Sequence, residues 1–403
     1  MPTPSSSRPA RLAAALLNAG LLIAPTAQAE TGPALPPGCQ AAGAATSAQH
    51  TPALPPPFPP VQLQVRAPLA PTVLPSAGRN YLLYELHLQN FATGAVTLRG
   101  IEVRDAGRPG AAPLATLADE ALRARLRQVT IGDDATEIRR LGSGQGVVAF
   151  LCLAFDGNRP VPAGLVHRIV LDSAVADGPV VAVGTTPLRL GRPLAGSDWT
   201  PGNNPSLESH HRMGLWVVGG EARIARRYAL DWKILDKQGK AHGGDPRDVR
   251  AYHAYGRQVL AVADGTVVDA RDGFPDNVPK TEAGFEPARP VTLDTIGGNQ
   301  VIVNLGGGRY AAYYHLQPGS VAVKTGERVR RGQPLARIGN SGDARWPHLH
   351  FQVTDRVDAM ASEGLPFVFD AYRVKTGSGA WEARGAEDPM GEVLVDFGPA
   401  DQK

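Results

Sequence analysis

The stretch 345-RWPHLHFQVTD-355 places two histidines one residue apart in a run of residues typical of a β-strand. Side chains alternate between the two faces of a strand, so we expect His348 and His350 to share one face. Two neighbouring imidazoles suit metal binding or proton transfer. An isolated pair of this kind could also be two ordinary hydrogen-bonded strand histidines. The choice between these interpretations depends on whether the chain has further metal ligands.

Composition narrows the class of protein. With 403 residues, the chain is expected to form two domains with tails, and its 46 glycines and 36 prolines suit β-rich domains with many turns. A net charge of +3, with arginines in pairs such as Arg226 and Arg227, argues against a nucleic-acid surface. The two cysteines, Cys39 and Cys152, permit one disulfide in an oxidising compartment.

The N-terminus is predicted to be an export signal. Arg8 and Arg11 precede the apolar run "LAAALLNAGLLIA", and Ala27 and Ala29 form a small-x-small cleavage site. We therefore predict a signal peptide over residues 1–29, cleaved near Ala29, and a periplasmic or secreted product. No second long apolar segment follows, so no permanent membrane span is expected.

The remaining chain divides by composition and periodicity into segments that predict an all-β protein. Short alternating runs between turn signals predict an antiparallel, immunoglobulin-like β-sandwich, and a second β domain with almost no helical periodicity follows it. The predicted segments are a Pro/Ala-rich linker (30–60), the sandwich (61–193), a turn-rich joint (194–212), the second domain (213–372) and a C-terminal tail (373–403).

Two features of these domains bear on a site. In the sandwich, Glu85 and His87 are expected on the solvent-facing side of a strand as ordinary polar residues. In the second domain, residues 271–298 are rich in Pro, Gly and charge, and we expect them to form a loop over one rim of the sheet.

A catalytic zinc site needs about three nitrogen or oxygen ligands and one open position for water. His350 can supply one ligand. Asp231 interrupts the apolar run "YALDWKI", where a charge is costly unless it is paired or metal-bound. The alternative interpretation is that Asp231 lies on an edge strand and faces water. His315, in "YAAYYHLQPGS", ends a strand with Tyr313 expected on the same face, and a packing role is equally compatible with its sequence.

The succession of "VLAVADGTVVDA", "GGNQVIVNLGGGRYAAYYHLQPGSVAVKTGERVRRGQPLARIGNSG" and "PHLHFQV" resembles the lysostaphin-type, LytM-like zinc metalloendopeptidases, which cut peptide bonds in peptidoglycan. The similarity covers about residues 213–356. It implies an antiparallel β domain with a groove floored by a sheet. It also implies that Asp231 and His350 bind one zinc ion, and that His315 and His348 handle protons and the oxyanion.

The chain departs from this family at one metal ligand. The family has His-x-x-x-Asp, but the position four before Asp231 is Arg227, whose guanidinium offers no lone pair to a metal. We expect Arg227 to line the site, where it is able to pair with Asp231. His211 and His210, in "SHHR", are the first candidates for a replacement third ligand; other candidates are His242 and His253.

Three functions fit these observations. The favoured one is an exported zinc endopeptidase that acts on peptidoglycan peptides. The alternative is a catalytically inactive LytM-like domain that binds peptidoglycan or docks onto another cell-wall enzyme, which Arg227 and the 271–298 loop would favour. An adhesion or carbohydrate-binding protein made of two β-sandwiches ranks last, because it leaves "HLHF" and "YYHL" unexplained.

Overall fold

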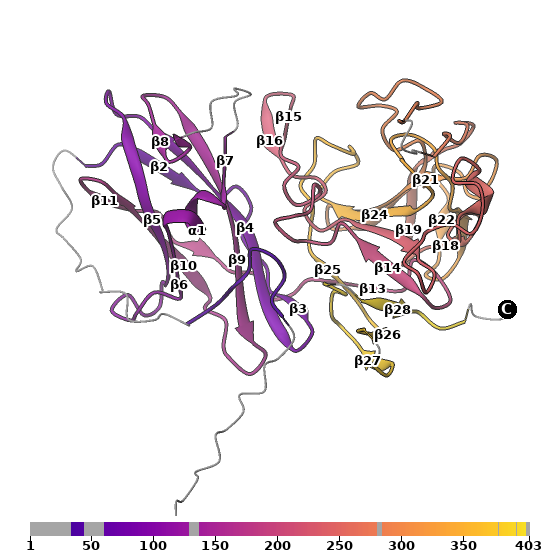
Figure 1. Cartoon of the computed structure of the whole chain (residues 1–403), viewed down its shortest axis with the longest axis horizontal. Helices are drawn as coiled ribbons and strands as arrows, with labels where there is room; N and C mark the ends of the chain where they lie inside the picture. The colour runs from indigo at the N-terminus through magenta and orange to yellow at the C-terminus, as the bar shows by residue number, and fades with distance from the viewer. Residues whose placement is uncertain are drawn as a thin grey trace, which may run out of the picture. The chain divides into compact units, whose positions relative to one another are not determined.

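The computed structural model describes residues 34–43, 60–128, 137–279, 284–377, 379–391 and 393–399. These residues are almost entirely strands and turns, with a short helix α1 (Asp119–Arg123) and a single 3-10 turn at Val249–Ala251 (Figure 1), so the all-β prediction is confirmed. No helix among them is long and apolar enough to cross a membrane. The predicted signal peptide lies outside the described residues.

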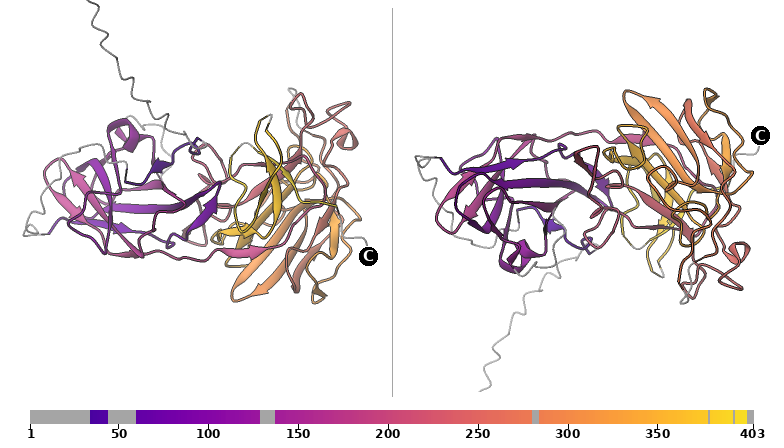
Figure 2. Two further views of the ribbon diagram at one scale, coloured as in Figure 1. Left: turned by 90° about the horizontal axis from the view of Figure 1, so that it is seen from below. Right: turned by 90° about the horizontal axis from the view of Figure 1, so that it is seen from above.

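The first part of the chain is a sandwich of two sheets. One sheet has the order β1-β9-β4-β2, with β3 on β4 and β7 on β9; the other has the order β11-β10-β5-β6, with β12 on β10 and β8 on β5. The long strands β4 and β9 run side by side in every view (Figures 1 and 2). Leucines of β4 and β9 pack on apolar residues of β5 and β10, which closes one core. The strands are β1 (Gln40–Ala41), β2 (Leu63–Arg66), β3 (Leu74–Ser76), β4 (Arg79–Asn90), β5 (Val96–Asp105), β6 (Ala115–Ala118), β7 (Leu126–Gln128), β8 (Arg140–Leu141), β9 (Gly146–Asp156), β10 (Gly164–Leu171), β11 (Val175–Asp177) and β12 (Val181–Ala182).

The predicted linker at 30–60 is wrong where the structure describes it. Strand β1 pairs in parallel with β9, and Cys39 forms a disulfide with Cys152 on β9. A Pro-rich segment buries too little apolar surface to fold alone, but a covalent bond and a strand ladder hold it against the sandwich. Residues 44–59 lie outside the described chain.

The second part is built on an antiparallel sheet whose described strands number ten, in the order β22-β19-β20-β21-β24-β17-β14-β28-β26-β27. Three two-stranded sheets, β13-β25, β15-β16 and β18-β23, accompany it. The strands are β13 (Leu188–Leu190), β14 (Trp199–Gly202), β15 (Trp216–Val218), β16 (Glu221–Arg223), β17 (Leu230–Ile234), β18 (Gln258–Leu260), β19 (Gly265–Arg271), β20 (Asn299–Gly306), β21 (Arg309–Leu316), β22 (Arg328–Val329), β23 (Pro334–Arg337), β24 (Leu349–Thr354), β25 (Phe367–Phe369), β26 (Tyr372–Lys375), β27 (Glu382–Arg384) and β28 (Leu394–Asp396).

The predicted joint and tail both contribute strands to this sheet. β14 lies within residues 194–212 and pairs with β17, while β26, β27 and β28 lie at or beyond the start of residues 373–403. These strands have three or four residues each, which is too short for a period-2 pattern to stand out from the turns around them. The predicted boundaries were therefore wrong at both ends of the second domain.

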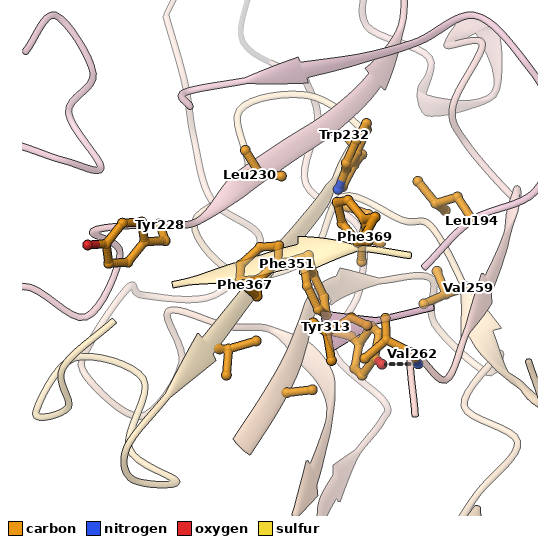
Figure 3. Close-up of a cluster of buried hydrophobic side chains, with 14 of the residues drawn as sticks. Leu194, Tyr228, Leu230, Trp232, Val259, Val262, Tyr313, Phe351, Phe367 and Phe369 are labelled. Atoms are coloured by element: carbon orange, nitrogen blue, oxygen red, sulfur yellow. Dashed lines mark hydrogen bonds between the residues drawn. The ribbon is translucent and has the colours of Figure 1, made fainter. Parts of the chain in front are cut away.

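The apolar face of the large sheet determines where its polar face lies. Figure 3 shows Trp232 beside Phe369, with Phe351 next to Phe367; the ring centroids of these two pairs are 5.9 Å and 5.2 Å apart. The same core includes side chains of the sandwich, such as Leu83, so the two predicted domains share buried surface. Alternation along β17 and β24 then leaves polar side chains on the opposite face.

We predict that a double Cys39→Ser/Cys152→Ser variant loses about 2–4 kcal/mol of unfolding free energy, because the disulfide closes a loop with a sequence separation of 113 residues. Urea unfolding followed by tryptophan fluorescence measures the change. Reducing the wild-type protein should shift its midpoint toward that of the variant. An unchanged midpoint after reduction would contradict the disulfide's contribution.

Candidate functional site

The site begins with the register of three strands. β17 and β24 pair so that Asp231 lies opposite His350, and β21 and β24 pair so that Tyr314 lies opposite His350. Leu230 and Phe351, on the same two central strands, face the core. Asp231, His350 and Tyr314 therefore form a row on the polar face of the sheet.

Asp231 is the hub of this row. Its Oδ1 lies 2.9 Å from Nδ1 of His350 and 3.4 Å from Nε2 of His348. Its Oδ2 lies 3.5 Å from Nε2 of His211 and accepts a hydrogen bond of 2.6 Å from Asn203. Burial alone would raise the pKa of Asp231, but the three histidines outweigh it and hold the pKa well below its usual range. The carboxylate is therefore ionised.

His211 completes a cluster with Asp231 and His350. It comes from the segment between β14 and β15, and its side chain is buried. Nδ1 lies 3.3 Å from the carbonyl oxygen of Ala229, which only accepts, so this nitrogen carries the hydrogen and the Nε2 lone pair faces Asp231. Burial holds the pKa of His211 well below its usual value and favours the neutral ring. His210 is exposed and its ring packs 4.5 Å from that of His211, at the edge of the same pocket.

His315 and His348 lie together beside this cluster, with ring centroids 4.9 Å apart. Nδ1 of His315 lies 2.9 Å from the carbonyl oxygen of Ser341, and Nδ1 of His348 lies 2.7 Å from that of Trp346. Both rings therefore turn Nε2 toward the site. Burial lowers the pKa of His315 well below its usual value; burial would also lower the pKa of His348, but Asp231 raises it.

Tyr313 does not line the site, which corrects the sequence-based expectation. Its ring lies in the core and its hydroxyl accepts a hydrogen bond of 2.9 Å from the backbone N–H of Val262 (Figure 3). His315 has φ = 63°, a left-handed conformation that breaks the alternation of β21. Strict period-2 counting therefore placed Tyr313 and His315 on one face, whereas Tyr314 and His315 line the pocket.

Arg227 does not line the site or pair with Asp231. Its Nη2 lies 2.8 Å from Glu85 and its Nη1 lies 2.8 Å from Glu363, and all three side chains are buried. Glu85 is 2% exposed, although it was expected on the solvent-facing side of its strand. A buried carboxylate from the sandwich draws Arg227 away from the polar face, and Arg226 lines the pocket in its place.

The cluster lies in a pocket of about 340 Å³. The 271–298 loop contributes Ile296 and Gly297 to its wall, and Trp346 lines another part. Three cationic side chains also line it. Arg345 pairs with Asp343 at 2.6 Å, whereas Arg226 and Lys233 form no ion pair with any residue that the structure describes. His242 and His253, the other ligands considered from the sequence, are not among its lining residues.

The sequence motifs did not identify two residues that contact the cluster, Gln352 and Asn203. Oε1 of Gln352 lies 2.9 Å from Nε2 of His350, and its position two residues after His350 on β24 could have indicated it. Asn203, which donates to Asp231, lies just after β14 in the predicted joint, where no periodic signal marked it.

The donor set fits one zinc ion. Asp231, His211 and His350 each offer one atom, and these atoms lie within 4.8 Å of one another. Two ligands of a tetrahedral zinc with bonds of about 2.1 Å are roughly 3.4 Å apart. Oδ1 of Asp231 lies 2.9 Å from His350 and Oδ2 lies 3.5 Å from His211, so the carboxylate contacts both imidazoles at roughly this spacing. The lone pair of His211 that faces the carboxylate is suited to bind a cation between them.

Comparisons with known proteins concern mainly the second part of the chain. Residues 248–362 match Peptidase family M23, which leaves His211 and Asp231 before the matched region. The peptidoglycan DD-endopeptidases ShyC and ShyA of Vibrio cholerae are 33% identical over 78 residues and 37% identical over 59 residues. These alignments cover 19% and 15% of this chain, and 18% and 13% of the relatives, so less than a fifth of each relative is spanned.

Among solved structures, a putative peptidase M23 from Pseudomonas aeruginosa is 16% identical, with 65% of this chain and 89% of that chain covered and a TM-score of 0.22. The catalytic domain of lysostaphin from Staphylococcus simulans is 19% identical, with 43% and 86% covered and a TM-score of 0.22. The family match includes His315, His348 and His350. Residues 248–362 of this chain therefore form a domain of the Peptidase family M23 type.

Proposed function

We propose that this chain is a zinc metalloendopeptidase that hydrolyses peptide bonds in peptidoglycan peptides. The observation that carries the proposal is the lone pair of His211 Nε2, which faces Asp231 and supplies the imidazole that the Arg227 position lacks. His211, Asp231 and His350 would hold one zinc ion. The curated relatives are named as peptidoglycan endopeptidases, which supports this reaction and this substrate class.

A bound zinc ion would polarise the scissile carbonyl and lower the pKa of a water molecule. The chain's own contribution is proton movement and charge stabilisation by His315 and His348. Carbonyl oxygens hold both Nδ1 hydrogens, so each Nε2 is free to accept a proton when neutral and to donate one when charged. Burial keeps His315 neutral, which suits it to accept the proton of the attacking water.

The pocket lining supports a substrate that carries carboxylates. Arg226 and Lys233 line the pocket, and Nε of Arg226 is buried without a hydrogen-bond partner among the described residues. Guanidinium groups bind carboxylates through paired hydrogen bonds. Peptidoglycan peptides carry such groups, so these cations are suited to hold the substrate beside the metal ligands.

The alternative, an inactive domain that binds peptidoglycan or docks onto another cell-wall enzyme, rested mainly on Arg227 filling the metal position. Arg227 is bound to Glu85 and Glu363 instead, which removes that support. We also propose that the protein works in the periplasm or outside the cell, since the Cys39–Cys152 disulfide is typical of oxidising compartments.

We predict that His211→Ala abolishes tight zinc binding while His210→Ala retains it, because His211, unlike the exposed His210, turns a buried lone pair toward Asp231. The expected loss of affinity exceeds the roughly 10- to 100-fold that follows from changing an outer partner of a ligand. Chelator competition and metal analysis of dialysed protein measure it. Equal zinc retention by both variants would show that His211 is not a ligand.

Substituting His348→Gln should lower kcat for a peptidoglycan peptide by about 10²- to 10⁴-fold, the usual contribution of a positioned acid or base. Zinc content should remain that of the wild type. The matched control is His242→Gln, which removes a histidine outside the pocket. Chromatographic separation of cleaved peptides gives the rates, and undiminished cleavage by His348→Gln would contradict the assignment.

For Arg226→Gln we expect KM for a carboxylate-bearing peptide to rise about 10- to 150-fold, since losing a hydrogen bond to a charged group costs about 1.5–3 kcal/mol. Amidating the carboxylates of the peptide should remove the difference between variant and wild type. Arg247→Gln, at an exposed arginine, is the control. A KM that is unchanged in Arg226→Gln would exclude this arginine from substrate binding.

A further inference from the structure

We infer that Glu85, in the N-terminal sandwich, is a positioning residue for the metal centre. Through Arg212 and Arg227 it holds both segments that supply the ligands His211 and Asp231. The inference rests on the proposed function, because it concerns the geometry of the proposed ligands. It assigns the sandwich a role in assembling the site.

The first connection runs through Arg212, the residue next to His211. Its guanidinium is completely buried, with Nη1 donating to Glu85 and Nη2 donating to the backbone carbonyls of Tyr84 and Leu151 at 3.0 Å and 3.4 Å. All three acceptors belong to β4 or β9 of the sandwich. The segment that carries His211 is therefore bound to the sandwich by a side chain one residue away.

The second connection runs through Arg227, four residues before Asp231. Nη2 donates to the other carboxylate oxygen of Glu85 at 2.8 Å, and Nη1 lies 3.2 Å from the backbone carbonyl of Gly364 and 2.8 Å from Glu363. The carboxylate of Glu85 thus bridges Arg212 and Arg227, which lie close in sequence to His211 and Asp231. This carboxylate thereby joins the two segments at a second place, in addition to the contact of His211 with the carbonyl oxygen of Ala229.

Regular secondary structure does not hold His211 in place. The residue lies between the end of β14 at Gly202 and the start of β15 at Trp216, so no strand ladder fixes its backbone. Near it, the Ser209 hydroxyl accepts from the His211 backbone N–H at 3.2 Å. The ring of Phe150 on β9 packs under the Arg212 guanidinium, 5.1 Å from its centre. Arg212 therefore links this segment to β4 and β9 by hydrogen bonds, beside the packing of Met213 and Leu215 on Val148 and Phe150.

Without the charge of Glu85, Arg227 would keep one carboxylate partner, Glu363, and the buried guanidinium of Arg212 would have none among the described residues. An uncompensated buried charge is strongly destabilising, so the segments would shift until the arginines reach water. Because His211 follows Arg212, its Nε2 would leave the position facing Asp231. Metal binding is expected to weaken before the sheet that carries Asp231 and His350 is disturbed.

The sandwich offers a matched control in Glu102. This carboxylate is also buried and forms an ion pair of 2.8 Å with Arg104, but it lies on β5 in the other sheet and has no contact with Arg212 or Arg227 among the described residues. Glu85→Gln and Glu102→Gln therefore remove the same group from the same sandwich. Both variants should lose stability, and only the first should change the metal site.

The test uses the full chain loaded with zinc, and with cobalt as a spectroscopic probe of the ligand geometry. We expect Glu85→Gln to bind zinc about 10- to 100-fold more weakly than the wild type, as when other outer partners of metal ligands are removed. Its cobalt absorption spectrum should shift toward that of His211→Ala. Glu102→Gln should match the wild type in both measurements, and Glu85→Asp, which keeps the charge, should recover part of the affinity.

Wild-type affinity and an unaltered cobalt spectrum in Glu85→Gln would overturn the inference, and so would equal losses in Glu85→Gln and Glu102→Gln. If Glu85→Gln does not fold, Glu85→Asp decides, since wild-type affinity and spectrum in that variant would refute positioning by this carboxylate. A wild-type protein that binds neither metal would instead refute the proposed metal centre itself, which separates the two failures.

Discussion

The pairing of β17 with β24 is the constraint on which both the core and the candidate site depend. In the observed register, Asp231 lies opposite His350 while Trp232 lies opposite Leu349. A slip of one residue would turn the carboxylate into an aromatic core and Trp232 out of it. The packing of Trp232 and Phe351 with the rings of β25 therefore holds the two proposed ligands side by side.

The motifs of the second domain predicted much of this site because strand alternation is a local property. His348 and His350 were expected to share one face of a strand, the family resemblance assigned Asp231 to the same metal site as His350, and all three are found together. The alternation rule failed for Tyr313 and His315, because the positive φ of His315 changes the face on which its side chain lies without changing the sequence pattern.

Features that depend on distant contacts were beyond sequence reasoning. Arg227 and Glu85 are 142 residues apart, and nothing in either segment indicates that they pair. His211 was considered as a ligand from its residue type, but its position depends on that same pairing through Arg212. The short strands at 199–202 and 394–396 were not predicted for a related reason. Pairing with neighbouring strands, rather than a pattern in their own residues, makes these segments extended.

The arginine at position 227, where the resemblance implies a histidine, and the position of His211 have one physical explanation. A guanidinium at this position needs a buried carboxylate, and Glu85 supplies it from the sandwich. The ion pairs of Glu85 with Arg227 and Arg212 bring the His211 segment to the sheet, where an imidazole faces Asp231. The N-terminal sandwich is thereby part of the structure that surrounds the proposed metal ligands.

The most direct test of this account is a crystal structure of the zinc-loaded protein with anomalous diffraction data collected on both sides of the zinc absorption edge. The account predicts one zinc peak, bonded to His211, Asp231 and His350. A peak bonded to other residues, or a zinc ion held without His211, would contradict it.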